Sequence, residues 1–424
     1  GAREWARRLS EELPDWYDPK DSEYFTKEEL NISGKVVIEA TEYGDVLATS
    51  GLPYALGPET PSERSATYAD TCGQAATLTF FTTLLPAPPA APDRTPAGAA
   101  GPAPFPDPRA YASDPQNGWA RDWTYRRARC AGNTSDQAVN VGDVTQQNWL
   151  NDMGYGYVFL GRAAAEEERA RGWRGGVNLT AVRELEDRSY ALYWFLKNSS
   201  RFLSSTWPQR FALSNTTGTA HGLSKLFYLR DTRRAIGPDG FVLQHEPLRN
   251  TFGPTGERFW DSVALGEYND DIHGLDGCSY PEYLTHSSVG SKPFFIPLRA
   301  LIVGNTTNLL TAGKTMAQSF WANANTRLHP SEWTTGVAAG GAAVLMVRRG
   351  WDTADLLGHV PEVQGFLNSS AVGQPLEWSG LPAYPPINGS ACQWGRCIPT
   401  DTAAAAEAAD WYPGGQCAAA RGAA

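Results

Sequence analysis

Small and apolar residues recur most regularly between Lys292 and Trp351. The pattern predicts an apolar strand, a turn and a second apolar strand that ends in Thr311-Ala312-Gly313. After a polar loop, Pro330 precedes a run rich in Gly and Ala, and proline is favoured in the first turn of a helix, so we predict a helix there. A strand that runs into a glycine beside a helix N-terminus favours an anion-binding or cofactor-binding junction.

The rest of the chain carries weaker patterns. The β-branched run Lys35–Thr41 predicts a buried strand, and a short helix is expected at Asp45–Thr49. Thr77–Leu85 is a strand candidate, and Leu179–Leu203 has helical spacing. Residues 86–108 hold nine of the chain's 30 prolines, which excludes a central strand or a helix. We interpret them as an extended surface insertion, with a PxxP-type ligand as the alternative.

Two later regions are less regular. Gly222–Arg234 and Phe241–Leu243 are interpreted as strand elements around a basic cluster. Beyond Trp351 the pattern weakens, and from Asn368 onward it indicates only loops, turns and a short Ala-rich run.

Composition narrows the class of protein. Of the 424 residues, 42% are hydrophobic and 11% aromatic, which is typical of a packed globular protein. The formal net charge of -10 argues against a nucleic-acid partner, because phosphate binding needs clustered Lys and Arg. No apolar run reaches the roughly 18 residues that a membrane-spanning helix needs.

Sequons and cysteines favour a secreted glycoprotein. N-x-S/T sequons begin at Asn31, Asn133, Asn178, Asn198, Asn215, Asn305, Asn368 and Asn388. The six cysteines, an even number that suits disulfides, are Cys72, Cys130, Cys278, Cys392, Cys397 and Cys417. The alternative is that the sequons reflect a Ser/Thr-rich composition and that the cysteines are buried thiols. No His follows Cys392-x4-Cys397 at zinc-like spacing, so no metal site is predicted.

Several short motifs occur in an order that points to one family. Thr41-Glu42-x-Gly44-Asp45 follows a strand, and Tyr228–Arg234 reads Y-L-R-D-T-R-R. Asp271-Ile272-His273 and Arg327–Trp333 follow, after Trp123–Arg127 and Asp143–Trp149 in the middle region. Together with the run at 292–351, these resemble FAD-dependent oxidoreductases of the glutathione-reductase type, in the subgroup with "IPLRALI…NLLTAGK…RLHPSEW". The resemblance covers roughly residues 35 to 360.

The chain departs from this family at one point. The family begins with a strand and a G-x-G-x-x-G turn that holds the FAD pyrophosphate, and nothing before Val36 supplies them. We therefore expect either that the chain lacks the N-terminal third of a longer protein or a partner segment, or that it is a form that cannot hold FAD alone.

The resemblance implies roles for individual residues. Thr41 and Gly44 would lie beside the adenosine-pyrophosphate path. Ala312, Gly313 and Lys314 would approach the ribityl chain and pyrophosphate. Arg327, His329 and Pro330 would lie near the isoalloxazine, where the helix dipole stabilises negative charge on the reduced flavin. For Gly313 a plain turn, for Pro330 an ordinary first-turn proline and for His329 a buried core histidine remain the alternatives.

Two further predictions concern charged side chains. His273, next to Asp270 and Asp271, is a candidate general base, with a surface histidine as the alternative. His273 and His329 are thus the catalytic candidates. For Arg230, Arg233 and Arg234 we favour structural ion pairs over binding of a substrate carboxylate.

The predicted fold is α/β, a two-lobed glutathione-reductase-type scaffold with an incomplete Rossmann lobe and a β-rich substrate or cap lobe. Residues 1–57 and 293–367 would form the FAD-binding lobe, 58–292 the cap lobe with its insertion at 86–108, and 368–424 a Cys-containing tail. The activity implied is hydride transfer from a small organic substrate to FAD in a secreted, extracellular or secretory-lumen enzyme. The alternative is a non-catalytic extracellular structural or assembly glycoprotein that reuses the scaffold and binds an assembly partner.

Overall fold

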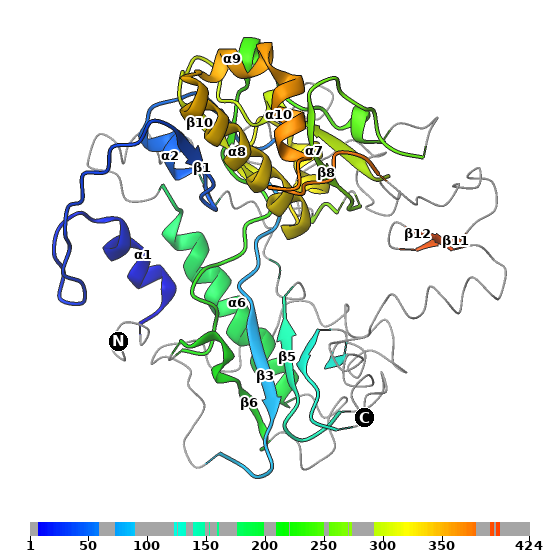
Figure 1. The fold of residues 1–424 in the computed structure, drawn as a ribbon. Helices are drawn as coiled ribbons and strands as arrows, with labels where there is room; N and C mark the ends of the chain where they lie inside the picture. Colours follow the sequence, from blue (N-terminus) through cyan, green and yellow to red (C-terminus); the bar gives the residue numbers. More distant parts are fainter. Residues whose placement is uncertain are drawn as a thin grey trace.

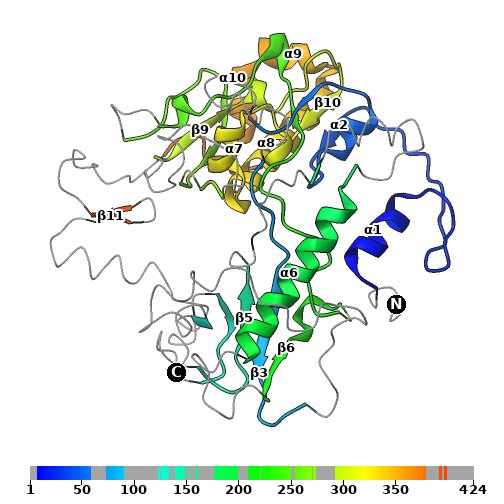
Figure 2. The same ribbon diagram turned by 180° about the vertical axis from the view of Figure 1, so that it is seen from behind.

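The computed structural model describes most of the chain (Figures 1 and 2). The described residues are 7–58, 73–89, 123–124, 126–132, 139–148, 152, 159–160, 176–198, 209–219, 221–249, 254–269, 271–273 and 292–378, together with the backbone of 391–393 and 396–398. Most of the insertion predicted at 86–108 and of the tail at 368–424 therefore lies outside the described residues, so their predicted character stays a prediction.

One group of elements is built on an antiparallel sheet, in the lower half of Figure 1. Its strands are β3 (Phe80–Leu84), β4 (Arg127–Arg129), β5 (Val144–Gln147) and β6 (Phe211–Leu213), in the order β4-β5-β3-β6. Side chains of β3 alternate between buried and half-buried, as a strand covered on one face requires. The strand predicted at Thr77–Leu85 is confirmed as β3.

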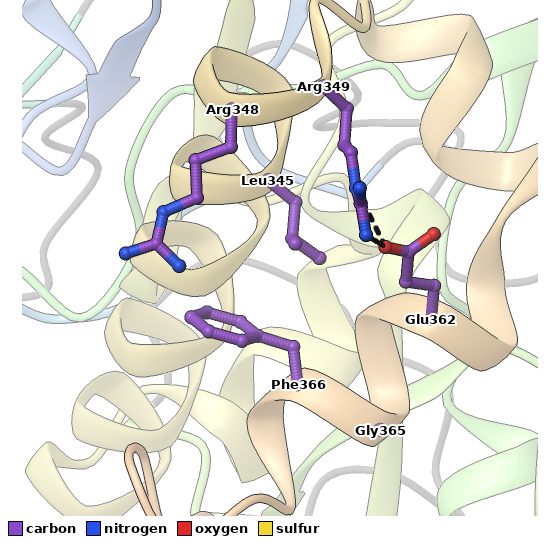
Figure 3. Close-up of a pocket in the computed structure, with 6 residues that line it drawn as sticks. All are labelled: Leu345, Arg348, Arg349, Glu362, Gly365 and Phe366. Carbon is purple, nitrogen blue, oxygen red and sulfur yellow. Dashed lines mark hydrogen bonds and ion pairs between the residues drawn. The ribbon is translucent and has the colours of Figure 1, made fainter.

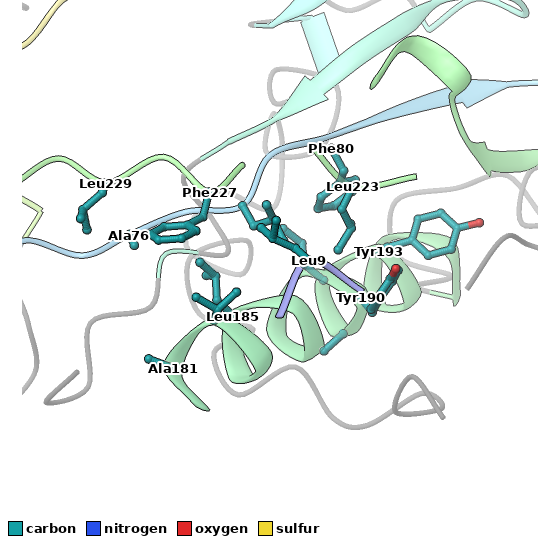
Figure 4. Packing of buried hydrophobic residues seen from close by; sticks show 14 of the residues in the cluster. Leu9, Ala76, Phe80, Ala181, Leu185, Tyr190, Tyr193, Leu223, Phe227 and Leu229 are labelled. Carbon is teal, nitrogen blue, oxygen red and sulfur yellow. The ribbon is translucent and has the colours of Figure 1, made fainter. Parts of the chain in front are cut away.

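A long helix packs on this sheet. Helix α6 (Leu179–Asn198) begins after Asn178, whose side-chain oxygen accepts a hydrogen bond from Ala181 N at 3.1 Å. Its apolar face, including Leu185 and Tyr193, joins Phe80 in a buried cluster (Figure 4). The predicted helix over 179–203 is therefore confirmed over Leu179–Asn198, and residues 199–203 lie outside the described residues.

The N-terminal helix α1 (Leu9–Tyr17) lies along α6 (Figure 1). Leu9 and Leu13 enter the same buried cluster. The Glu186 carboxylate of α6 accepts hydrogen bonds from Leu9 N and Ser10 Oγ, both at 2.6 Å. A buried carboxylate thus satisfies the free N–H groups at the start of α1 and fixes its position on α6.

The second group of elements surrounds helix α8 (His329–Arg349). Strands β8 (Ser262–Gly266) and β9 (Phe294–Pro297) form an antiparallel pair that shares a buried cluster with α8 and with α10 (Val360–Leu367). At Gly341 of α8, a Cβ atom would lie 2.5 Å from Leu367 Cδ2, so the absence of a side chain lets α10 approach. The predicted lobe boundary at 292/293 falls between β8 and β9, and the division into domains stays a prediction.

The pair that matters most for function is β1 (Val37–Glu39) with β10 (Leu309–Thr311). The two strands are parallel, with Val37 opposite Leu309 and Glu39 opposite Thr311, so their carboxyl ends coincide. The prediction of a fully buried first strand is wrong, because Val37 and Ile38 are 41% and 38% exposed. Among the described residues, β10 is the one strand that pairs with β1.

Helices also form where the sequence pattern was weak. The predicted polar loop after Lys314 contains α7 (Phe320–Thr326), whose residues are all buried and whose start is capped by the Ser319 hydroxyl. Beyond Trp351 the chain forms α9 (Thr353–Gly358) and then α10. The prediction of a loop is therefore wrong at α7, and the weaker pattern beyond Trp351 named no element where α9 and α10 form.

The remaining elements are short. They are α2 (Asp45–Thr49), β2 (Tyr54–Ala55), η1 (Asn215–Thr217), β7 (Arg234–Ala235), η2 (Pro238–Gly240), η3 (Glu246–Arg249), η5 (Leu298–Ala300), η6 (Gly313–Thr315), β11 (Ala391–Gln393) and β12 (Arg396–Ile398). Helix α2 has the predicted bounds. The tail predicted to hold only loops and turns instead contains the antiparallel β11–β12 pair.

The architecture as a whole mixes helices and sheets, with both parallel and antiparallel strand pairs. An α/β class is therefore correct at this level, and the glutathione-reductase-type arrangement of two lobes stays a prediction. None of the helices in the described part of the chain is long and apolar enough to span a bilayer.

Candidate functional site

The ends of β1 and β10 bring two predicted cofactor segments together. Glu39, at the end of β1, accepts hydrogen bonds from the N–H groups of Thr41 and Val46, each at 2.6 Å. The Thr41 hydroxyl accepts from Asp45 N at 2.8 Å. Both side chains thereby satisfy the free N–H groups at the start of α2, so the turn between β1 and α2 is held by its own residues.

Gly44, in the middle of this turn, has a left-handed backbone with φ of +66°. A Cβ atom here would lie 2.6 Å from Arg233 Cβ and 2.7 Å from Arg233 O. Glycine is therefore required by packing against the chain's own backbone. This reason differs from the predicted one, which was a place beside the adenosine-pyrophosphate path.

The second segment follows β10 directly. Ala312 N donates to Glu39 O at 2.9 Å, and Gly313 N donates to Thr335 Oγ1 of α8 at 3.0 Å. Gly313 has φ of +64°, and a Cβ atom there would meet Glu332 Cγ at 3.4 Å, an ordinary contact. The strand end is thus tied to β1 on one side and to α8 on the other.

Lys314 is buried where the carboxyl ends of β1 and β10 meet the start of α8, a place that we call the junction. Its Nζ forms an ion pair with Glu42, donates to Leu229 O at 2.6 Å and lies 4.9 Å from the centroid of the Tyr228 ring. The three interactions consume the donors of the ammonium group. Lys314 therefore links the two strand ends to the loop that carries Tyr228.

The start of α8 faces the same junction. His329 and Pro330 occupy its first turn, with Glu332 following. The His329 side chain is 92% exposed, with its Nε2 3.9 Å from Glu332 Oε2, so the alternative of a buried core histidine is wrong. Burial raises the pKa of Glu332, while the nearby Lys314 charge partly opposes the rise.

Immediately before α8, Arg327 is buried in a polar network. Its Nη2 donates to Asp271 Oδ2 at 2.6 Å and to Asp271 O at 3.0 Å, and its Nη1 donates to Tyr228 Oη at 3.0 Å. The Tyr268 hydroxyl donates to the same Asp271 oxygen at 2.5 Å. Burial alone would raise the pKa of Asp271, but the hydrogen bond from His273 and the Arg327 charge together lower it below its usual value.

His273 extends this network to a third segment. Its Nε2 lies 3.1 Å from Asp271 Oδ1, and its Nδ1 lies 2.5 Å from Asp152 Oδ2. The predicted neighbour Asp270 lies outside the described residues. Each ring nitrogen of His273 thus lies within hydrogen-bond distance of a carboxylate oxygen. Action as a general base would require one of these contacts to open, and that role stays a prediction.

The three arginines of the Tyr228–Arg234 motif are all buried in ion pairs. Arg230 pairs with Asp152 at 3.1 Å, Arg233 lies 3.5 Å from Asp45, and Arg234 pairs with Asp231. Burial lowers the pKa of Arg233, an effect that Tyr54 and Asp45 offset in part. The ion pairs of Arg233 and Arg234 match the structural role favoured for the arginines from the sequence. Arg230 is paired in the same way, but its buried Nε has no hydrogen-bond partner among the described residues.

One hollow among the described residues lies elsewhere. About 540 Å³ in volume, it is lined by Leu345, Arg348, Arg349, Glu362, Gly365 and Phe366, between the end of α8 and α10 (Figure 3). Arg349 Nε donates to Glu362 Oε1 at 2.9 Å across it, and Arg348 lies over the Phe366 ring. It contains none of the predicted site residues. We give more weight to the junction, where buried charged groups converge.

Sequence reasoning missed several members of the network. Asp152, Tyr268 and Gln74 were not singled out, and Tyr228 was noted only within a motif. Asp152, Gln74 and Tyr228 are far in the sequence from the groups they contact, so no local spacing marks them. Tyr268 lies three residues before Asp271, and this local pair was not part of the motif. No group of His, Cys, Asp and Glu within the described residues is arranged to hold a metal ion.

The predicted sequons and cysteines are only partly covered by the structure. Asn31, Asn215, Asn305 and Asn368 are exposed, Asn178 caps α6, and Asn198 ends that helix. Asn133 and Asn388 lie outside the described residues, as do Cys72, Cys278 and Cys417. Cys392 lies opposite Cys397 in the β11–β12 register, and no described cysteine is a free thiol, Cys130 included. Glycosylation and disulfide pairing stay predictions.

Comparison with known proteins gives one match. The sequence profile of a family described as FAD dependent oxidoreductase matches residues 21–367. No curated protein and no solved structure matches the chain.

Proposed function

The chain belongs to the family of FAD-dependent oxidoreductases, and we propose that it oxidises a small organic substrate at the junction of β1, β10 and α8. One observation carries the location. The parallel register of β1 and β10 brings the Thr41–Gly44 turn and the Ala312–Lys314 segment to one edge, and Gly313 bonds directly to α8. Ligands of open α/β sheets bind at the carboxyl ends of strands in this way.

The residues at the junction fit part of FAD. Thr311 Oγ1, at the end of β10, is buried and has no hydrogen-bond partner among the described residues. Gly313, in the left-handed conformation, presents its backbone without a side chain. The first turn of α8 carries the positive end of a 21-residue helix. These features suit the ribityl and ring end of the cofactor, as the family assignment implies for Ala312, Gly313, Lys314, Arg327 and Pro330.

Each of these groups has a distinct task in the proposed site. FAD supplies the hydride acceptor. Glu39 and Thr41 hold the turn after β1, and Lys314 fixes the distance between that turn and Tyr228. Arg327 places a permanent positive charge next to α8, with Asp271 orienting its guanidinium. His273 links Asp152, through Nδ1, to Asp271, through Nε2, and so helps to position the Asp271 carboxylate against Arg327.

The visible absorption spectrum tests this proposal. Purified protein is expected to show flavin bands near roughly 370 and 450 nm, with about one FAD per chain released on denaturation. Anaerobic photoreduction should bleach the 450 nm band, and air should restore it. Folded protein that stays colourless after incubation with excess FAD would contradict the proposal.

We also propose that the protein is a secreted glycoprotein. Four sequon asparagines, Asn31, Asn215, Asn305 and Asn368, are exposed and accessible to a glycan. The intact mass of protein from its native source is expected to fall on treatment with an N-glycan endoglycosidase. An unchanged mass, together with all cysteines reactive to a thiol reagent, would exclude passage through an oxidising secretory compartment.

A further inference from the structure

The network around His273 joins five segments into one polar cluster. Ala75 N donates to His273 O at 2.7 Å, and Arg230 Nη1 donates to Ala75 O at 2.5 Å. Gln74, the preceding residue, accepts from His273 N through its side-chain Oε1 at 3.4 Å. With the Asp152 and Asp271 contacts, Gln74, Arg230, His273 and Arg327 form a continuous group, which we call the Gln74 cluster.

Three buried N–H donors of this cluster lack a hydrogen-bond acceptor in the described part of the chain. Gln74, Arg230 and Arg327 are only 2%, 3% and 3% exposed. Gln74 Nε2, Arg230 Nε and Arg327 Nε find no acceptor among the described residues. Leaving a buried donor unsatisfied is unfavourable, so such groups normally mark the place of a ligand or an ordered water.

The charges of the cluster favour an anion as that ligand. Arg230 and Arg327 are each paired with one carboxylate, Asp152 and Asp271. Each guanidinium keeps an Nε–H outside its ion pair. A carboxylate accepts hydrogen bonds from a guanidinium more strongly than a neutral acceptor does, and its two oxygens offer enough lone pairs to accept from three N–H groups.

The position of the cluster connects it with the proposed reaction. Arg327 stands directly before α8, and the ring centroid of half-buried Tyr228 lies 6.0 Å from Arg327 Cζ, 5.7 Å from Arg230 Cζ and 4.9 Å from Lys314 Nζ. Lys314 in turn belongs to the strand end predicted to contact the cofactor. A molecule bound to the cluster therefore lies next to the proposed flavin site.

We propose that the Gln74 cluster is a recognition site for a carboxylate group of the substrate, so that the substrate class is an organic acid. This inference rests on the proposed function only in calling the bound molecule a substrate. Binding of a carboxylate at the Gln74 cluster does not depend on that function. The side-chain amide of Gln74 gives the site its specificity. Its Nε2 is a neutral hydrogen-bond donor, and its Oε1 is held in place by the hydrogen bond from His273 N. Arg230 and Arg327 supply the attraction for the negative charge.

Benzoate and benzamide provide a matched pair of probes, because they have the same shape and differ in charge. Isothermal titration calorimetry on the full chain is expected to show one benzoate site and at least tenfold weaker binding of benzamide. In Gln74→Glu the acceptor for His273 N is kept, while the free donor becomes a second acceptor. Benzoate affinity should then fall at least tenfold. Gln74→Leu removes the donor without adding charge and should give a smaller loss.

A matched control is Gln364→Glu on α10, where the same change is made away from the cluster. This variant should bind benzoate as the unchanged protein does, and the urea midpoint of each variant shows whether it is folded. The proposal is overturned if benzoate and benzamide bind equally, if benzoate does not bind, or if both Gln74 variants bind it with unchanged affinity.

The same preparations separate this inference from the proposed function. A flavin that is reducible in a protein without a benzoate site would overturn the carboxylate site alone. A colourless protein that binds benzoate in a Gln74-dependent way would overturn the redox function alone.

Discussion

Replacing Gly44 by alanine is expected to lower the free energy of unfolding by about 2–4 kcal/mol, since a left-handed backbone and steric overlap each contribute about 1–2 kcal/mol for a non-glycine residue. The added Cβ would meet backbone and Cβ atoms of Arg233, which cannot rotate away. Arg233 is itself buried, and its Nη1 donates to Tyr43 O at 2.8 Å. The clash therefore acts on the contact that holds the turn after β1 against the Thr232–Arg233 segment.

Gly350 is the matched control for this change. It has a similar left-handed backbone, with φ of +72°, but a Cβ atom there would meet nothing within 4 Å. Gly350→Ala should therefore cost only the conformational term, about 1 kcal/mol. Urea unfolding of both variants gives the comparison. If Gly44→Ala were no less stable than Gly350→Ala but lost its flavin, packing would be the wrong explanation and a direct cofactor contact the right one.

Local signals in the sequence predicted several elements well. Helix α2 has its predicted bounds, and α8 begins one residue before Pro330. Helix α6 starts at Leu179 as predicted, because Asn178 provides a cap and apolar residues follow at helical spacing. In each case the signal lies within a few residues of the element it defines, so no tertiary contact is needed to find it.

Other elements depend on contacts that no local pattern records. Helix α7 is short and contains Asn323 and Asn325, and it is stable because all seven of its residues are buried. Asn323, for example, donates to Arg230 O at 2.7 Å, far away in the sequence. Val37 and Ile38, at the start of β1, indicated a buried strand, but both are exposed. Burial of an edge strand depends on which segments pack beside it, and the local sequence does not record them.

The candidate site was predictable in part for the same reason. His273 and Arg327 stood out because each lies in a motif that resembles the family, and because the chain has only 6 histidines. Their partners did not, because Asp152 is separated from His273 by more than a hundred residues and Gln74 by still more. Which carboxylate pairs with which cation is decided by the fold, and the paired arrangement around His273 follows from it.

The largest effect on the site is expected from breaking the pair between Asp271 and Arg327. Asp271→Asn alone should lower the free energy of unfolding by about 3–5 kcal/mol, because it leaves a buried guanidinium without its counter-charge. Arg327→Met alone should cost less than this, since His273 and Tyr268 still contact Asp271. The double variant should lose less than the sum of the two, which gives a coupling energy of about 2 kcal/mol or more in a double-mutant cycle.

The exposed pair Arg349–Glu362 is the control for this cycle. It joins α8 to α10 with side chains that are 56% and 37% exposed, so the cycle of Arg349→Met and Glu362→Gln should give a coupling below about 1 kcal/mol. Equal couplings for the two pairs would contradict a desolvated network at Arg327.

Lowering the pH should remove the stabilisation that the ionised Asp271 carboxylate gives to the folded protein. The pKa of Asp271 is lowered in the folded protein, by its hydrogen bond with His273 and by the Arg327 charge against the opposing effect of burial. Its contribution is therefore complete above the pKa of the unfolded chain, about 3.9, and is lost as the pH falls below that value. The stability difference between the unchanged protein and Asp271→Asn should be constant from pH 7 to about 5 and shrink toward pH 3. A difference that grows in acid would mean that Asp271 is protonated in the folded state at neutral pH, and that Arg327 is held by another group.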